Sequence, residues 1–247
     1  MKKPEGAGTK GRDQGNLNRP YLTEPRLESI PWLIHGFGTA VWTEADFNAV
    51  PEWAGFRPVI LNQVHSDVIH CLDAPPARSL EGDALITATP RLFLVIKTAD
   101  CLPVLIVDEG RRVVAAVHCG WRGTRKRILE KVVGELRSRF GSDPASLVAV
   151  LGPCIGPECY EVGSDVRAGF AKAGFPEAVF RKSPVPDKFF LDLRKANAWL
   201  LETAGVPRKN VFAVDACTHC RPDLLSFRRD RDKTKRMFSF VAIRSRS

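Results

Sequence analysis

The chain reads Leu92-Phe93-Leu94-Val95-Ile96, then Leu102-Pro103-Val104-Leu105-Ile106-Val107, then Val113-Val114-Ala115-Ala116-Val117. Runs that are apolar at nearly every position indicate β-strands buried on both faces, as in layered α/β folds. Shorter strands are predicted around these three, at 59–61, 68–72, 84–86, 147–151, 211–214 and 237–243. We therefore expect an α/β fold built of layers.

The clearest helical pattern runs over residues 124–140. Its apolar side chains repeat with a helical period and fall on one face, and Gly141 is a natural C-terminal stop. Ser164 and Asp192 are suitable residues to cap two further helices. No internal repeat or dividing linker is visible. The sequence thus predicts a disordered basic segment over 1–20 and a single domain over 21–247.

The composition excludes several classes of protein. The chain has 247 residues, of which 44% are hydrophobic and 26% charged, as is usual for a soluble globular protein. No apolar run approaches the ~20 residues of a membrane-spanning helix, and the N-terminal residues lack the apolar stretch of a secretion signal. The seven cysteines show no disulfide framework. We expect a cytoplasmic protein with reduced thiols.

The net charge of +9 is concentrated at the two ends of the chain. Residues 1–20 carry five Lys or Arg against two acidic residues, and residues 221–247 carry nine against three. No basic face interleaved with aromatic residues appears, so neither a nucleic acid nor a membrane is an expected partner. The C-terminal arginines are either solvated charge or contacts for an anionic substrate.

Three apolar segments end in polar residues that include a possible metal ligand. They are the segments ending in His65, in Cys101 and in His118. Two imidazoles and a thiolate are good zinc donors, and three protein ligands leave a fourth position open for water or substrate. The ligands are 36 and 17 residues apart, so no short metal motif is present. A structural histidine and a buried apolar cysteine remain alternative interpretations of these residues.

Other polar residues close to these three are candidates for the site. Asn62 and Asp100 could orient the ligands or contact substrate, or could serve only as turn and cap residues. Arg122 could hold phosphate at the start of a helix, and Arg228 could bind an anion through paired hydrogen bonds. The pair Cys217 and Cys220 has C-x-x-C spacing, but no second pair at zinc-finger distance exists.

Several short motifs, in order along the chain, carry a resemblance to a known family. They are Asn62-Gln63-Val64-His65-Ser66, Gly82-Asp83-Ala84-Leu85, Thr98-Ala99-Asp100-Cys101-Leu102-Pro103, His118-Cys119-Gly120-Trp121-Arg122-Gly123, Gly152-Pro153-Cys154-Ile155-Gly156, Tyr160-Glu161-Val162, Asp192-Leu193, Cys217-Thr218 and Ser226-Phe227-Arg228-Arg229-Asp230. With these motifs the chain resembles the YfiH-type laccase-domain family, also called polyphenol oxidase-like or purine nucleoside phosphorylase family proteins.

The resemblance implies a fold, a cofactor and an activity. The fold is a sandwich of mixed β-sheets between helices, and the cofactor is zinc at His65, Cys101 and His118. The activity is phosphorolysis of adenosine, inosine and S-methyl-5'-thioadenosine, together with deamination of adenosine. A purine nucleoside and phosphate are then the expected partners, and the protein is expected to be a monomer or weak homodimer. Ala40 stands where the family usually has an arginine, and Lys235 where it has a glycine.

Two other activities compete with this one. In the first, Cys101 is the nucleophile of a cysteine hydrolase, with His118 or His65 as its base; a role in peptidoglycan precursor editing belongs to this alternative. In the second, the protein is a copper-dependent polyphenol oxidase. Copper is the less expected metal, because multicopper sites need more than the five histidines of this chain.

Overall fold

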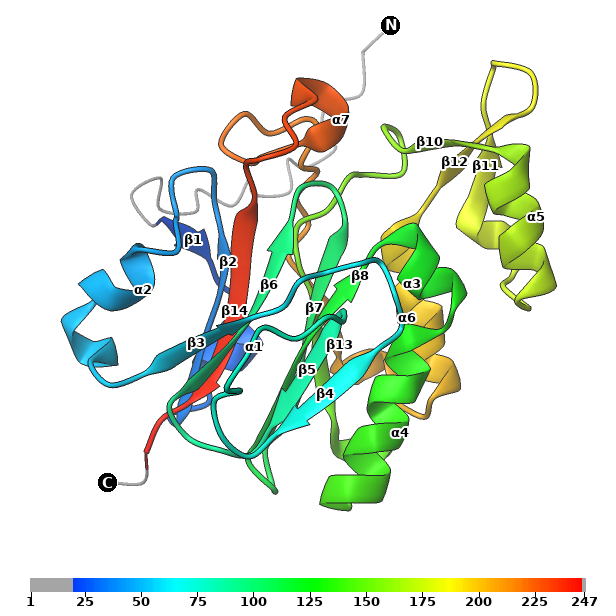
Figure 1. The fold of residues 1–247 in the computed structure, drawn as a ribbon. Coiled ribbons are helices and arrows are strands. Elements are labelled where there is room, and N and C mark those ends of the chain that lie inside the picture. The colour runs from blue at the N-terminus through cyan, green and yellow to red at the C-terminus, as the bar shows by residue number, and fades with distance from the viewer. Residues whose placement is uncertain (1–19, 246–247) are drawn as a thin grey trace, which may run out of the picture.

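The structure is a computed structural model that describes residues 20–245 (Figure 1). Two mixed β-sheets lie face to face, and a third, small sheet extends from one side of the molecule. The layered α/β fold expected from the apolar runs is confirmed, and so is the sandwich of mixed sheets that the family resemblance implies. The predicted disordered segment lies outside the described residues except for Pro20, whose carbonyl accepts hydrogen bonds from Thr39.

The six-stranded sheet contains most of the buried strands predicted from the sequence. Its strands, in spatial order, are β13 (Val211–Ala213), β9 (Val148–Leu151), β7 (Leu102–Asp108), β8 (Val113–Cys119), β5 (Ala84–Thr87) and β4 (Ile69–Leu72). The two edge strands pair in parallel with their neighbours and the rest pair antiparallel. β7 and β8 form a hairpin, so the beginning of one lies beside the end of the other.

The five-stranded sheet lies against one face of the first sheet. Its strands, in spatial order, are β1 (Tyr21–Leu22), β2 (Leu33–Gly38), β14 (Met237–Ile243), β6 (Leu92–Thr98) and β3 (Arg57–Ile60). The C-terminal strand β14 is inserted between β2 and β6 and pairs with both. The chain crosses between the two sheets at 99–101, where β6 ends and β7 is about to begin.

Alternate side chains of each central strand enter two different cores. In β7, Val104 and Ile106 join the core beneath the helices, whereas Leu105 and Val107 pack between the two sheets. Both cores are fully buried at these positions. This explains the near-continuous apolar runs, since a strand covered on both faces has no solvent-facing side.

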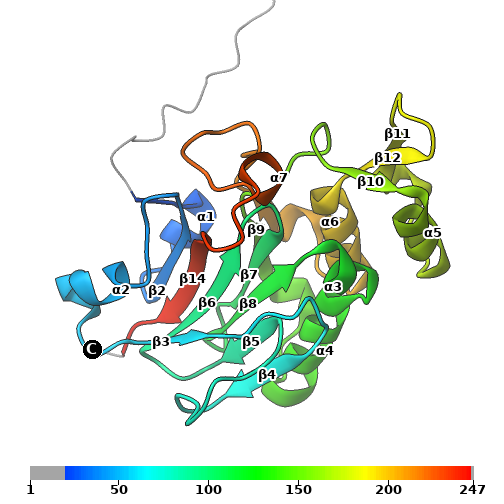
Figure 2. The same cartoon turned by 45° about the horizontal axis from the view of Figure 1, so that its top comes forward.

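Helices cover the outer face of the six-stranded sheet (Figures 1 and 2). They are α3 (Trp121–Arg125), α4 (Ile128–Phe140) and α6 (Leu193–Thr203). The outer face of the other sheet is covered by an aromatic cluster with α2 (Asp46–Ala49) and the 3-10 turn η1 (Pro51–Trp53). The remaining short elements are α1 (Pro25–Glu28), α7 (Phe227–Asp230), η2 (Pro144–Ser146), η3 (Glu177–Val179) and η4 (Arg208–Asn210).

The helix predicted over 124–140 is in fact two helices. Arg127 has a left-handed backbone with φ of 63°, which interrupts the hydrogen-bond ladder between α3 and α4. Its guanidinium is held by Glu130 and by the carbonyl of Ala173, contacts that periodicity alone cannot reveal. The predicted cap at Asp192 is confirmed, but Ser164 is the first residue of its helix and Gly163 occupies the cap position.

The small third sheet projects beside the main body. It consists of β10 (Glu161–Gly163), β12 (Lys188–Leu191) and β11 (Phe180–Lys182), with α5 (Ser164–Lys172) packed on it. The apolar patterns did not predict these strands, because they are short and only partly buried. Within residues 20–245, no helix has the length and apolar character needed to cross a membrane.

Candidate metal centre

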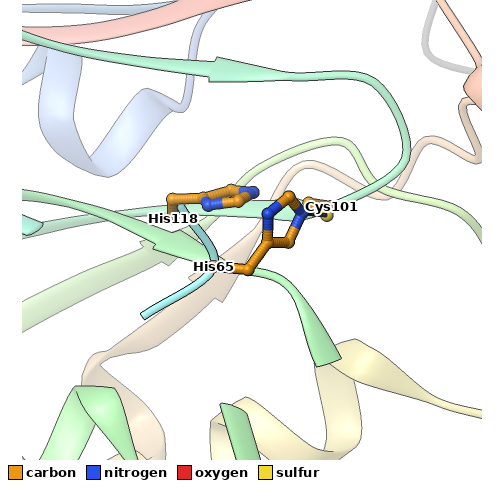
Figure 3. Close-up of side chains that lie close together, drawn as sticks. All are labelled: His65, Cys101 and His118. Carbon is orange, nitrogen blue, oxygen red and sulfur yellow. Dashed lines mark hydrogen bonds between the residues drawn. The ribbon is translucent and has the colours of Figure 1, made fainter. Parts of the chain in front are cut away.

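The three side chains predicted to bind metal come together at one edge of the six-stranded sheet (Figure 3). His118 lies near the end of β8, and Cys101 directly precedes β7; the antiparallel pairing of these strands makes the two residues neighbours. His65 enters from the loop between β3 and β4. One ring nitrogen of each histidine and the sulfur lie within 4.8 Å of one another, with Cys101 Sγ 3.9 Å from His65 Nε2.

A buried carboxylate, Asp83, holds two of these segments in place. Its Oδ1 lies 2.7 Å from His118 Nδ1 and also accepts the backbone N–H of His65 at 3.1 Å. Its Oδ2 accepts the backbone N–H and the hydroxyl of Ser66 at 2.5 and 2.6 Å. With Nδ1 bound to a carboxylate, the other ring nitrogen of His118 is left for the cluster, as in many metal sites.

The charges of the cluster depend strongly on one another. Burial raises the pKa of the Cys101 thiol, but the positive charge of His118 and hydrogen bonds from both histidines outweigh this and lower the pKa to about 6. Burial lowers the pKa of His118, while Cys101 and Asp83 raise it to about 9. Burial also opposes ionisation of Asp83, but its hydrogen bonds to His118 and Ser66 lower its pKa to about 2. The arrangement therefore favours a thiolate at Cys101.

The backbone around the ligands adopts unusual conformations. His65 and Asp100 have left-handed φ angles of 57° and 85°. Such residues are held only where neighbouring contacts determine them, and they concentrate at functional sites. Asp100 is held by its own carboxylate, which accepts the Thr218 hydroxyl at 2.7 Å and the backbone N–H of Arg228 at 2.6 Å.

Gly120 allows the three ligands to approach closely, and its replacement is a test of the site. A Cβ at this position would lie 3.0 Å from His65 Cδ2 and 3.1 Å from Cys101 Sγ. We expect Gly120→Ala to weaken metal binding about tenfold by displacing both ligands. Titration with a competing chelator measures this. Gly134→Ala is the matched control, because Gly134 has open space around its Cα; equal affinities in the two variants would contradict the expectation.

The cluster opens into a cavity of about 800 Å³. This volume is within the range of roughly 300–1,000 Å³ that is usual for small-molecule sites. The aromatic residues Trp121, Tyr160 and Phe227 line part of it. Five cationic residues line another part: Lys97, Arg228, Arg231, Lys233 and Arg236. The cavity is thus suited to a ligand with both an aromatic and an anionic group.

Three of the four residues predicted to contact substrate line this cavity, namely Asn62, Asp100 and Arg228. The side-chain amide of Asn62 donates to Glu81 at 3.1 Å, and the Arg228 guanidinium donates to the carbonyl of Glu161 at 3.0 Å. Arg122 is not among the lining residues; its guanidinium is exposed and lies 4.6 Å from the ring centroid of Trp121. Substrate contact by these residues stays a prediction.

Asp83 is the site residue that the sequence did not single out. Its motif, Gly82-Asp83-Ala84-Leu85, contributes to the family resemblance, but nothing in its spacing from the ligands indicates contact with them. Asp83 and His118 are 35 positions apart and meet only because β5 pairs with β8. The feature of the sequence that could have indicated Asp83 as a site residue is its position as an acidic residue directly before a buried strand.

The donor set fits zinc. Zinc binds Cys sulfur at about 2.3 Å and His nitrogen at about 2.0–2.1 Å, so the ligand atoms of a tetrahedral site lie about 3.3–3.8 Å apart. The separation of 3.9 Å between Cys101 Sγ and His65 Nε2 is close to this. The three donors come from one side, and the cavity leaves room for a fourth ligand.

A family model described as multi-copper polyphenol oxidoreductase laccase matches residues 44–244. The chain belongs to this family. Among solved structures of similar fold is YfiH from Bacillus licheniformis, with a TM-score of 0.84 and 29% identity over 93% of this chain and 98% of that one. The expected family and fold are confirmed.

Relatives in this laccase family have names that describe nucleoside chemistry. A purine nucleoside phosphorylase of Deinococcus radiodurans is 41% identical and covers 74% of this chain and 69% of its own. Purine nucleoside phosphorylase YfiH of Escherichia coli strain K12 is 38% identical over 75% and 73%. Adenosine deaminase RL5, from an unknown prokaryotic organism, is 40% identical over 58% and 55%. The names of these relatives support the expectation that this protein is an enzyme.

Proposed function

We propose that this protein is a zinc-dependent purine nucleoside phosphorylase that acts on adenosine, inosine and S-methyl-5'-thioadenosine and also deaminates adenosine. The observation that carries the proposal is the opening of the His65, Cys101 and His118 cluster into a cavity with aromatic and cationic walls. The names of the relatives support the same reaction class. Small metabolites in the cytoplasm are the substrates that we propose.

The aromatic wall is suited to a purine ring. Tyr160 is largely buried, and the guanidinium of Arg228 lies 5.3 Å from its ring centroid, which holds the ring in place. Phe227 is 36% exposed although it is large and apolar, and it lines the cavity. A flat heterocycle that packs on such rings removes apolar surface from water.

The cationic wall is suited to phosphate. Lys97, Arg231 and Lys233 line the cavity and form no ion pair within residues 20–245. Of the acidic residues, Asp100 lines the same cavity, but its two oxygens already accept hydrogen bonds. The free cationic groups can therefore bind and orient a phosphate dianion by charge-assisted hydrogen bonds.

His65, Cys101 and His118 would hold the zinc, with Asp83 fixing the His118 ring. A bound zinc supplies Lewis-acid chemistry and lowers the pKa of water in its open position. The protein residues position the substrate: the aromatic side chains hold the base and the cationic side chains hold the phosphate. Phosphorolysis transfers the ribose C1′ from the base nitrogen to a phosphate oxygen, and the base leaves after gaining a proton.

The test is product analysis of the zinc-loaded protein with adenosine and with inosine, with and without phosphate. We expect adenine or hypoxanthine with ribose 1-phosphate only when phosphate is present, and inosine from adenosine without phosphate. A double variant, Arg231→Ser with Lys233→Ser, should raise the phosphate KM by about tenfold. Arg208→Ser, in an exposed ion pair with Glu202, is the matched control. No base release from either nucleoside by zinc-loaded protein contradicts the proposal.

One observation favours a second candidate, a cysteine hydrolase. Asp83, His118 and Cys101 lie in series, with Asp83 bound to Nδ1 of the histidine and the histidine beside the thiol. This order is also that of an acid–base–nucleophile triad. Peptidoglycan precursors are the substrates proposed for this candidate. The presence of His65 as a third donor within the cluster favours metal binding instead.

A further inference from the structure

A second group of soft metal ligands lies outside the cluster described above. The donor atoms of Cys159, His219 and Cys220 all lie within 4.8 Å of one another, and the two sulfurs are 3.4 Å apart. Cys159 ends a turn before β10, whereas His219 and Cys220 lie in the loop between β13 and α7. Among residues 20–245, this group and the His65 cluster are the two that bring three such donors together.

A third thiol, that of Cys217, lies in the same loop as His219 and Cys220, although its sulfur is not within 4.8 Å of all three donors of the group. It accepts the backbone N–H of Gly156 at 3.1 Å, and a Cβ on Gly156 would touch its sulfur. The carbonyl of Cys217 accepts the N–H of Cys220 at 3.2 Å, which closes the C-x-x-C turn. Backbone N–H groups that point at sulfur stabilise thiolates, and a tight turn between two cysteines is typical of structural zinc sites.

Hydrogen bonds within the protein hold the loop that carries Cys217, His219 and Cys220. The guanidinium of Arg229 donates to the carbonyls of Thr218, His219, Arg221 and Leu224. An isolated β-bridge between Cys154 and Cys217 aligns the two segments that carry the cysteines. Donors that are held in place by other contacts lose little conformational entropy when a metal binds.

We propose that Cys159, Cys217, His219 and Cys220 form a second zinc site, of the structural Cys₃His type. Three thiols and one imidazole are the number and kind of ligands that close a tetrahedral site without an open position. A disulfide between Cys159 and Cys220 would use only two of the four donors and would leave Cys217 beside it. The role of this site would be structural: it would stabilise segments that line the cavity and would not take part in the reaction.

The proposed site is connected to the cavity at two points. Thr218, between two of the ligands, donates its hydroxyl to Asp100, the residue before Cys101. Tyr160, directly after Cys159, lines the cavity. Metal at the second site would therefore fix the segments that shape the aromatic wall and the loop carrying Cys101.

The experiment measures zinc per chain in the protein purified under reducing conditions. We expect about two zinc ions in the wild type and about one in Cys101→Ala, which keeps the second site. Cys159→Ser with Cys220→Ser should also retain about one. Cys71→Ser is the matched control, since Cys71 lies on β4 in neither cluster, and it should retain two. One zinc in the wild type together with none in Cys101→Ala overturns the proposal.

A second measurement does not depend on the folding of the double cysteine variant. In Cys101→Ala protein, iodoacetamide should label Cys159 and Cys220 slowly until a chelator is added, and cobalt in place of zinc should show strong thiolate-to-metal absorption. Rapid labelling before chelation contradicts the proposal. So does a mass two hydrogens lower than expected under reducing conditions, which would identify a Cys159–Cys220 disulfide.

Discussion

Cys101→Ala is expected to leave the His65 site almost free of metal and to lower nucleoside turnover by about a thousandfold or more. Two imidazoles would remain, and two neutral ligands bind zinc far more weakly than two with a thiolate. The sulfur lies close to both imidazoles, at 3.9 Å from His65 Nε2 (Figure 3). Zinc analysis and the phosphate-dependent assay measure the two effects.

Alkylation of Cys101 distinguishes its role as a metal ligand from a role as a catalytic nucleophile. A metal-bound thiolate is protected, so iodoacetamide should label Cys101 only after a chelator removes the metal. Cys71→Ala is the control, since that thiol lies on β4 away from the cluster. Rapid labelling of Cys101 in metal-loaded protein, with unchanged metal content in Cys101→Ala, would favour the cysteine hydrolase.

Asp83→Asn is expected to destabilise the fold by about 3–5 kcal/mol, the range for breaking a buried charged network. The side chain is fully buried and faces four donors, from His118, from the His65 backbone and from both groups of Ser66. An amide presents an NH₂ group to two of these donors, so at least two polar groups would lose their partner. Urea unfolding of the metal-free variant measures the change.

Metal affinity gives Asp83 a second, independent test. Loss of the carboxylate partner of His118 should weaken zinc binding by roughly 10–100-fold. Asp67→Asn is the matched control, because Asp67 lies in the loop that carries His65 but is partly exposed and pairs with Lys126 and Lys131. Such a surface pair contributes at most about 1 kcal/mol. Equal unfolding free energies for the two variants would show that the Asp83 network is dispensable.

The apolar runs predicted nine of the eleven strands of the two large sheets, missing β1 and β2, and did not predict how the strands pair. β14 was predicted with its observed limits, because both faces of a central strand are buried. The small sheet was missed, since its strands are short, partly exposed and rich in charged residues. The break at Arg127 was also missed, because it depends on contacts with residues distant in sequence.

The three candidate metal ligands were predicted from their positions at the ends of apolar runs and from the family motifs, and they do lie together. Their convergence could not be predicted from spacing, since it requires the β7–β8 hairpin and the loop that carries His65. The contacts of Asp83 and of the Cys159 cluster could not be predicted for the same reason. Each joins residues separated by tens of positions, and only the pairing of strands and loops brings them together.

The position of β14 has a consequence for synthesis on the ribosome. This strand lies between β2 and β6, two strands made much earlier, and each of its neighbours pairs with it along most of its length. Until β14 emerges, the facing edges of β2 and β6 are exposed and available to other nascent chains. The residues of α7, which wall the cavity, emerge only just before it. The cavity is therefore completed only when the last strand has been made, and chaperones that shield strand edges should raise the yield of folded protein.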